Sequence, residues 1–242
     1  MHSVLFIHEN FPAQFGAFAK FLAGQGWRVV FATAHESFVP GKPVKRDGMT
    51  VVRYRRAREP KASHVYLQGT ERALLNGQAL ARLGIALSKK GFRPDIVVAH
   101  SGWGSGSFAR VVWPNAKLVQ YLEWWYRFPP VDAAAGEIEQ YSVDEAARTL
   151  VKNLPFLLDF RQADLVITPT AFQARQLPDF VRDNLFVQHD GVNCHDFRPA
   201  SHQETGFTWE GLPPGAPVVT FATRGMEPTR GFPDFMAAAA RL

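Results

Sequence analysis

The sequence has 242 residues, of which 46% are hydrophobic and 20% are charged, a composition typical of a folded globular protein rather than a disordered one. Cys194 is the only cysteine, so an internal disulfide is excluded, and eight histidines without a cysteine cluster argue against a structural zinc site. The formal net charge of +5 is compatible with an anionic partner.

The first part of the chain alternates short apolar runs with amphipathic segments. Runs rich in Val, Ile and Phe predict buried strands over residues 3–8, 27–33 and 49–54. Apolar residues at helical spacing predict a helix over 13–22, which ends at Gly24 and Gly26. A strand, a helix and a strand within about thirty residues form a βαβ unit, and such a unit requires a parallel sheet.

The same alternation continues along the chain. A long amphipathic helix is predicted over 67–90, and Ser142 with Glu145 forms a capping box that opens another helix. Further strands are predicted over 96–100, 116–121, 165–168 and 185–188, with a helix over 171–177. Alternating strands and helices predict an α/β fold with a doubly wound, Rossmann-like parallel sheet.

The composition changes after residue 199. Residues 200–215 are polar and rich in Gly and Pro, which is typical of a linker. A strand over 217–222 and a helix from 232 then indicate the first βα unit of a second domain. We therefore expect one domain over 1–199, a linker over 200–215 and the truncated start of another domain over 216–242.

Loops that follow the strands are the predicted site, because ligands of open parallel sheets bind beyond the carboxyl ends of the strands. The loop after the first strand, residues 8–16, lacks the glycine pattern of a dinucleotide site. His100 opens a segment with three glycines, and its imidazole could donate a hydrogen bond, act as a base or merely be satisfied at a strand end. Trp124 and two neighbouring aromatic residues could stack on a sugar, lie at a membrane interface or pack in the core.

A cluster of cations over residues 53–61 could touch acidic lipid head groups or a phosphate-bearing substrate, or simply be a solvated strand end and loop. No signature of nucleic-acid recognition is present, so we expect no nucleic-acid partner. No apolar run approaches the roughly 20 residues of a membrane-spanning helix. We expect a cytoplasmic protein with possible peripheral contact at the inner face of the membrane.

Two stretches carry a family resemblance. The first stretch contains three motifs. Ala-Asp stands before an apolar strand and Thr in residues 163–170, Asp-Gly-Val-Asn lies within 186–193, and Phe-Arg-Pro is 197–199. Residues 218–224 form an apolar run that ends at Arg224, and Arg230 with a glycine follows. This ordered set resembles the glycosyltransferases of family 4, which are retaining enzymes with two Rossmann-like domains, the GT-B fold. The resemblance is spread over the chain and is strongest from residue 163 onward.

The resemblance implies a retaining glycosyltransferase of the hexosyltransferase type. It would move a sugar from a nucleotide-sugar donor to a glycan or lipid-linked acceptor without a cofactor or a metal. Residues 1–199 would then be the acceptor-side domain and 216–242 the start of the donor domain, a fragment that we expect to be inactive alone. His100 matches the catalytic histidine, Arg224, Arg230 and Gly16 match the groups around the donor diphosphate, and acceptor contacts are expected from Glu9, Asn10, Trp103, Glu123 and Trp124.

The chain departs from the family pattern at several positions. Gly16 follows Phe15 instead of a second glycine, Arg230 stands where lysine is usual, and Asp190 and Asn193 stand where Asn and Asp are usual. The family's Glu-x7-Glu pair would fall beyond residue 242. Three alternatives stay open at this point: a nucleotide-sugar epimerase of the same architecture, a non-catalytic glycan-binding module, and a hydrolase with Ser101 as nucleophile, although the glycines of its elbow are missing.

Overall fold

The computed structural model describes residues 1–61, 64–131, 142–199, 210–213 and 216–241. The chain divides into two compact units, Met1–Asp190 and Gly191–Leu242. The boundaries that we predict for the acceptor-side domain, the linker and the donor domain stay a prediction.

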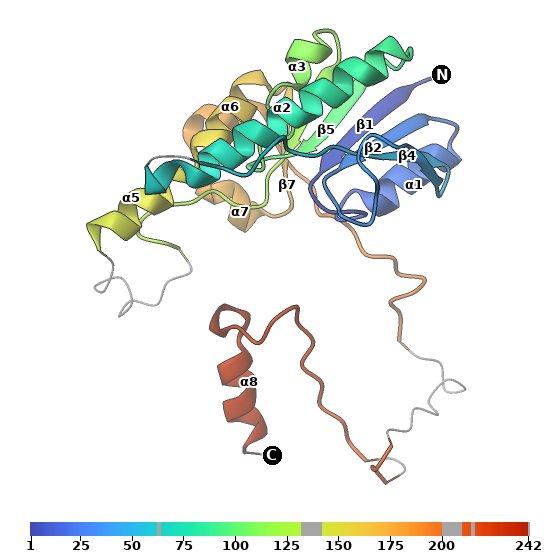
Figure 1. The fold of residues 1–242 in the computed structure, drawn as a ribbon. Coiled ribbons are helices and arrows are strands. Elements are labelled where there is room, and N and C mark those ends of the chain that lie inside the picture. The colour runs from blue at the N-terminus through green and yellow to red at the C-terminus, as the bar shows by residue number, and fades with distance from the viewer. Residues whose placement is uncertain (62–63, 132–141, 200–209, 214–215, 242) are drawn as a thin grey trace. The chain divides into compact units, whose positions relative to one another are not determined.

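The larger unit contains one sheet of eight strands in the order β3-β4-β2-β1-β5-β6-β7-β8 (Figure 1). Every pair of neighbours is parallel except β3 and β4. The predicted parallel α/β sheet is therefore confirmed. The strands are β1 (Ser3–His8), β2 (Arg28–Thr33), β3 (Val44–Arg46), β4 (Met49–Arg53), β5 (Ile96–His100), β6 (Lys117–Tyr121), β7 (Leu165–Thr168) and β8 (Leu185–Val187).

The chain winds in two directions from the middle of this sheet. From β1 it proceeds outward to β2 and β4, whereas from β5 it proceeds to β6, β7 and β8 on the other side. The winding therefore reverses between the adjacent strands β1 and β5. In open α/β sheets a crevice opens at the carboxyl ends of the strands where the winding reverses.

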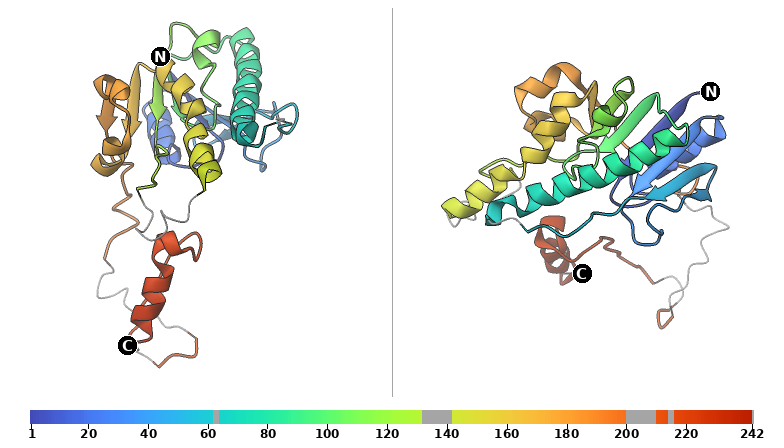
Figure 2. Two further views of the ribbon diagram at one scale, coloured as in Figure 1. Left: turned by 90° about the vertical axis from the view of Figure 1, so that its left-hand side faces the viewer. Right: turned by 45° about the horizontal axis from the view of Figure 1, so that its top comes forward.

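Helices cover both faces of the sheet (Figure 2). Helix α1 packs with Val4 and Phe6 of β1 on one face, whereas α2 and α3 pack with Leu5 and Ile7 on the other. Alternate residues of β1 thus enter opposite cores, as a strand buried on both faces requires. The helices of this unit are α1 (Gly16–Gly24), the 3₁₀ helix η1 (Val65–Leu67), α2 (Gln68–Lys89), α3 (Ala109–Val112), α5 (Val143–Val151), α6 (Leu154–Gln162), α7 (Ala171–Gln176) and the 3₁₀ helix η2 (Asp179–Asn184).

The buried face of α2 combines Leu80 with several small residues and excludes Leu74. Leu74 is 45% exposed, and the buried positions include Ala73, Gly77 and Gly84. The reason is close packing: a Cβ on Gly77 would lie 2.7 Å from the carbonyl oxygen of Gly104. Small residues, not large apolar ones, allow this helix to approach the loop after β5.

Two shorter features also differ from the sequence prediction. The antiparallel strand β3 was not expected, although Asp47 and Gly48, both with positive φ, form the kind of turn that joins antiparallel strands. Residues 217–222 form no strand, because a strand needs a hydrogen-bonded neighbour and this stretch has none among the described residues. The capping box at Ser142 and Glu145 is confirmed at the start of α5.

The smaller unit contains the 3₁₀ helix η3 (Pro228–Arg230) and α8 (Phe232–Ala239). Phe221 packs on the rings of Phe232 and Phe235, with centroids 5.6 and 4.9 Å away. No helix in the described part of the chain combines the length and apolar character needed to cross a bilayer.

Two glycines of α2 provide a matched test of the close packing. Gly77→Ala should lower the free energy of unfolding by about 1–3 kcal/mol, because its Cβ would also meet the ring of Phe108 at 2.9 Å. In Gly69→Ala the added Cβ would have no atom within 4 Å. This variant should raise the free energy of unfolding by up to about 1 kcal/mol, because alanine has the higher helix propensity. Denaturant unfolding measures both changes. Equal changes in the two variants would contradict the packing described here.

Candidate functional site

Two histidines end the two strands between which the winding reverses. His8 ends β1 and His100 ends β5, and their rings contact edge to face with centroids 4.7 Å apart. Both are buried. Burial, followed by the nearby His100, lowers the pKa of His8 to about 4, so this ring is neutral at physiological pH. Its Nδ1 accepts the backbone N–H of Asn10 at 2.8 Å, which leaves the proton on Nε2.

His100 is held in one orientation by two hydrogen bonds. Its Nδ1 donates to the carbonyl oxygen of Ser101 at 2.9 Å, and Nε2 lies 3.3 Å from Oε2 of Glu123, just after β6. The other carboxylate oxygen of Glu123 accepts a bond of 2.6 Å from Gln14. The hydrogen bond from His100 lowers the pKa of Glu123, so this carboxylate is ionised at neutral pH. The pair places a carboxylate and an oriented imidazole at the β1–β5 crevice.

The segment after His100, residues 101–107, forms a tight loop that we call the glycine loop. Gly102 and Gly104 have φ of +88° and +75°, and a Cβ at either position would collide, with the ring of Phe156 and with the backbone of Ala73 respectively. Glycine is therefore required at both positions for conformation and for space. This requirement explains the run of small residues seen in the sequence.

Asp159 of α6 holds the glycine loop in place through two hydrogen bonds. Its carboxylate accepts the backbone N–H of Gly102 at 3.0 Å and the hydroxyl of Ser107 at 2.5 Å, and the side chain is buried. Burial raises the pKa of Asp159 to about 6. Sequence reading missed this residue, because nothing in its local pattern distinguishes it from a surface carboxylate on a helix.

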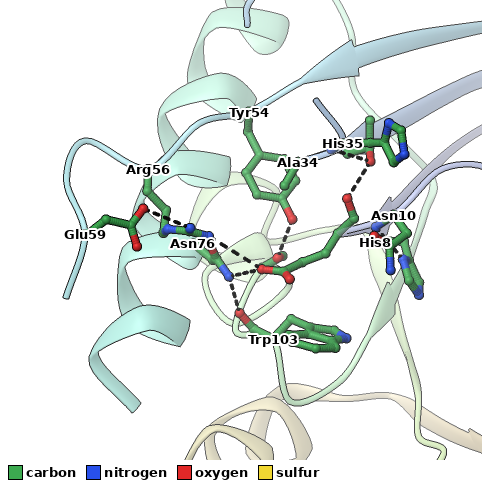
Figure 3. Close-up of polar contacts among 12 residues, drawn as sticks. His8, Asn10, Ala34, His35, Tyr54, Arg56, Glu59, Asn76 and Trp103 are labelled. Atoms are coloured by element: carbon green, nitrogen blue, oxygen red, sulfur yellow. Dashed lines mark hydrogen bonds and ion pairs between the residues drawn. The ribbon is translucent and has the colours of Figure 1, made fainter. Parts of the chain in front are cut away.

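Asn76 of α2 joins three loops at the edge of the crevice (Figure 3). Its amide nitrogen donates to Oε1 of Glu9 at 2.6 Å and to the carbonyl oxygen of Trp103 at 2.9 Å. Its amide oxygen accepts a bond of 3.1 Å from Arg56. A fully buried asparagine satisfied in this way fixes the loops that follow β1, β4 and β5 relative to one another. Sequence analysis missed Asn76 as well; a polar residue on the inner side of an amphipathic helix is the signal that could have found it.

A cavity of about 510 Å³ has His100 in its wall. Its wall comes from the first half of α2, the glycine loop, the segment after β6, and α5 with α6. It therefore lies at the carboxyl edge, where ligands of such sheets bind. Four of the predicted residues line it: His100, Trp103, Glu123 and Trp124.

The remaining predicted residues lie elsewhere. Glu9 and Asn10 line a smaller neighbouring cavity of about 380 Å³. Gly16 begins α1 and does not line the larger cavity; a Cβ there would collide with Pro12, which is a packing reason for glycine. Arg224 and Arg230 belong to the unit Gly191–Leu242, where Arg230 pairs with Glu227 at 3.2 Å.

The aromatic residues after β6 divide between site and core. Trp124 lines the large cavity and contacts Phe172, whereas Trp125 stacks on Phe160 at 5.9 Å in a buried cluster. Asp190 accepts a hydrogen bond of 2.7 Å from the hydroxyl of Tyr121. This bond gives the aspartate at that position a structural role.

The geometry at Ser101 contradicts the hydrolase alternative. The hydroxyl of Ser101 is buried and donates to Oε1 of Gln120 at 3.1 Å, while His100 binds the carbonyl oxygen of Ser101 and not its hydroxyl. A serine nucleophile needs its hydroxyl exposed and bonded to its base. Within the described residues no group of three metal-ligating side chains gathers.

The arginine-rich segment over 53–61 is mostly committed to internal contacts. Arg53 donates to the carbonyl oxygens of Ala34 and Phe38, Arg56 binds Asn76, and Arg58 forms a salt bridge of 2.6 Å with Glu71. Its guanidinium groups thus link neighbouring loops. This use disfavours the segment as a phosphate or lipid site.

A doubly wound parallel sheet with a cavity at the reversal of its winding defines the class of Rossmann-like proteins that hold ligands above the strand ends. Residues 25–197 match the model of the glycosyl transferase family 4 group. The chain belongs to this family. Comparison with curated protein sequences finds no match.

A solved structure with a TM-score above 0.5 shows the same fold. Sucrose-phosphate synthase from Thermosynechococcus elongatus is 13% identical, with a TM-score of 0.55 over 83% of this chain and 51% of that chain. The catalytic domain of starch synthase IV from Arabidopsis thaliana, bound to ADP and acarbose, is 14% identical over 84% of this chain and 54% of that one, with a TM-score of 0.47. The chain thus spans about half the length of each, and its fold is that of a Rossmann-like half of a GT-B glycosyltransferase.

The buried carboxyl of Asp159 makes stability depend on pH. Its folded pKa of about 6 lies above its ordinary value of 3.8, so its contribution is complete below about pH 4 and is lost as the pH rises through 6. Relative to Asp159→Asn, the wild type should lose up to about 3 kcal/mol of unfolding free energy between these limits. Denaturant unfolding across this pH range measures the difference. The exposed Asp183→Asn serves as a control and should show no such trend; a parallel course of wild type and Asp159→Asn would refute the assignment.

Proposed function

We propose that this chain forms the acceptor side of a retaining glycosyltransferase of the hexosyltransferase type. The enzyme would move a sugar from a nucleotide-sugar donor to a glycan or lipid-linked acceptor. The observation that carries the proposal is the cavity at the β1–β5 crevice, with the His100–Glu123 pair in its wall. Membership in the glycosyl transferase family 4 group supports it.

His100 is the proposed catalytic residue. Its Nδ1 is bonded to the carbonyl oxygen of Ser101, and we propose that a sugar hydroxyl meets Nε2 in place of, or together with, Glu123. The ionised Glu123 accepts hydrogen bonds and adds a negative charge to the wall of the cavity. Trp103, 42% exposed, and Trp124 offer apolar faces on which a sugar ring could stack. Glu9 and Asn10, at the neighbouring cavity, complete the proposed acceptor contacts.

Sugar transfer also requires that the charges that develop during the reaction be stabilised. The anomeric carbon becomes positive while the departing diphosphate becomes negative. Arg224, Arg230 and the loop at Gly16 are proposed to stabilise this diphosphate, so that neither a metal nor a cofactor is needed. A chain without the remainder of a donor domain is proposed to be inactive by itself. The proposal includes a cytoplasmic location with peripheral membrane contact and no nucleic-acid partner.

His100→Ala tests the proposed role in the complete gene product. Transfer of labelled sugar from nucleotide sugars to glycan and lipid-linked acceptors should fall by at least about tenfold in kcat, since a group aligned with the reacting centre is lost. His100→Asn, which is a smaller change to the buried site, should show the same loss. His2→Ala, at the opposite end of β1, is the matched control and should keep its activity. Near wild-type turnover in both His100 variants would remove this residue from the mechanism, and an inverted anomeric centre by NMR would contradict retention.

A further inference from the structure

The large cavity is a trough between two helical walls. One wall is η1 with the first half of α2, and the other is α5 with the start of α6. Figure 1 shows α5 close to the start of α2, and both helices line the cavity. The trough extends outward from the crevice, and Arg72 lies one turn, about 6 Å along the axis, outward from Asn76 on α2. A ligand longer than one ring could therefore start at His100 and continue between the helices.

Three cations line this trough: Arg72 on α2, Arg148 on α5, and Lys152 at the end of α5. All three are exposed, and none has a carboxylate within 4 Å in the described ranges. Arg148 and Lys152 instead lie over the rings of Tyr66 and Tyr126 at 5.7 and 4.9 Å.

The nearby carboxylates make their hydrogen bonds and ion pairs with other groups, although the charge of Arg148 also acts on Glu145. Asp144 accepts the hydroxyl hydrogen bond of Tyr66, Glu145 closes the capping box with Ser142, and Glu71 pairs with Arg58. Glu123 is the only acidic side chain in the described lining, and it is bonded to His100 and Gln14. The trough is therefore positive along both helices.

This arrangement opposes stability. Arg148 and Lys152 are four residues apart on one helix turn, a spacing at which like charges repel, and Arg72 faces the same cavity from the opposite wall. In a structural role, such charges would be separated or paired with carboxylates. A bound anion would relieve the repulsion.

We propose that the acceptor carries a phosphate group, which Arg72, Arg148 and Lys152 bind while its sugar or polyol ring lies at His100 and Trp103. A phosphate monoester has close to two negative charges at neutral pH, and guanidinium groups donate two parallel hydrogen bonds to its oxygens. The inference rests on the proposed glycosyl transfer, for which it names the acceptor class. Soluble sugar phosphates carry such a monoester, and phospholipid head groups carry a phosphodiester with one negative charge, to which the same guanidinium groups can donate hydrogen bonds.

Calorimetry on the 242-residue chain tests phosphate binding without any transferase assay. Inorganic phosphate and glucose 6-phosphate should bind with dissociation constants below about 10 mM, and salt should weaken binding. The variant R72Q/R148Q/K152Q should lose at least tenfold in affinity. The matched control R82Q/K89Q/R161Q removes three exposed cations from α2 and α6 that do not line the trough, and it should bind as the wild type does.

Sedimentation with vesicles distinguishes the two sources. If vesicles that contain phosphatidylinositol bind and compete with glucose 6-phosphate while vesicles of phosphatidylcholine alone do not, the phosphate belongs to a lipid. If glucose 6-phosphate binds without vesicle binding, the acceptor is a soluble sugar phosphate. Either result supports a phosphorylated acceptor, provided that the trough variant loses it.

Three outcomes would overturn the inference: no binding of either phosphate probe by the wild type, equal binding by the trough variant and the control, or equal affinity for glucose and glucose 6-phosphate. Each leaves glycosyl transfer itself standing, because transfer to a neutral acceptor needs none of these cations. Conversely, phosphate binding that persists in a protein without transferase activity would set aside the enzyme and keep the anion site.

Discussion

The reversal of winding between β1 and β5 is the constraint on which the rest of this structure depends. Because the two strands are neighbours but their connections leave in opposite directions, no connection covers the crevice at their carboxyl ends. The last residues of both strands are histidines in ring contact, and the glycine loop follows one of them directly. The cavity and the pair formed by His100 and Glu123 both lie at this reversal.

Buried polar side chains hold the crevice in shape, since a loop of small residues has little apolar surface of its own to pack. Asp159 binds the loop through two hydrogen bonds from α6, and Asn76 binds its backbone from α2. Both groups are desolvated, so each must be paired to be tolerated. Helices α6 and α2 thereby fix the position of the glycine loop, which directly follows His100. The ring of His100 is oriented before any ligand binds.

The distribution of positive charge separates two uses of arginine and lysine. The cations that are adjacent in the sequence, around residue 56, mostly tie loops together through carbonyl, amide and carboxylate partners. The cations of the trough come from separate helices and have no carboxylate partner among the described residues. The cations of the trough, and not those around residue 56, can therefore attract an anionic ligand. Proximity in sequence is a poor guide to free charge, because partners of Arg53 and Arg56 lie 19 and 20 residues away in the sequence.

The sequence by itself determined the parallel α/β sheet, because the period of apolar residues and the glycine or capping residues at segment ends are local properties. It also placed His100 at a strand end beside a loop of glycines, and its late motifs indicated the family. It could not show that His8 meets His100, that Leu74 faces outward while Asn76 is buried, or that Arg72 and Arg148 face one cavity. These facts depend on strand order and on how closely α2 approaches the glycine loop. Only the tertiary structure decides them, since contacts between residues far apart in sequence leave no periodic or local trace in a single chain.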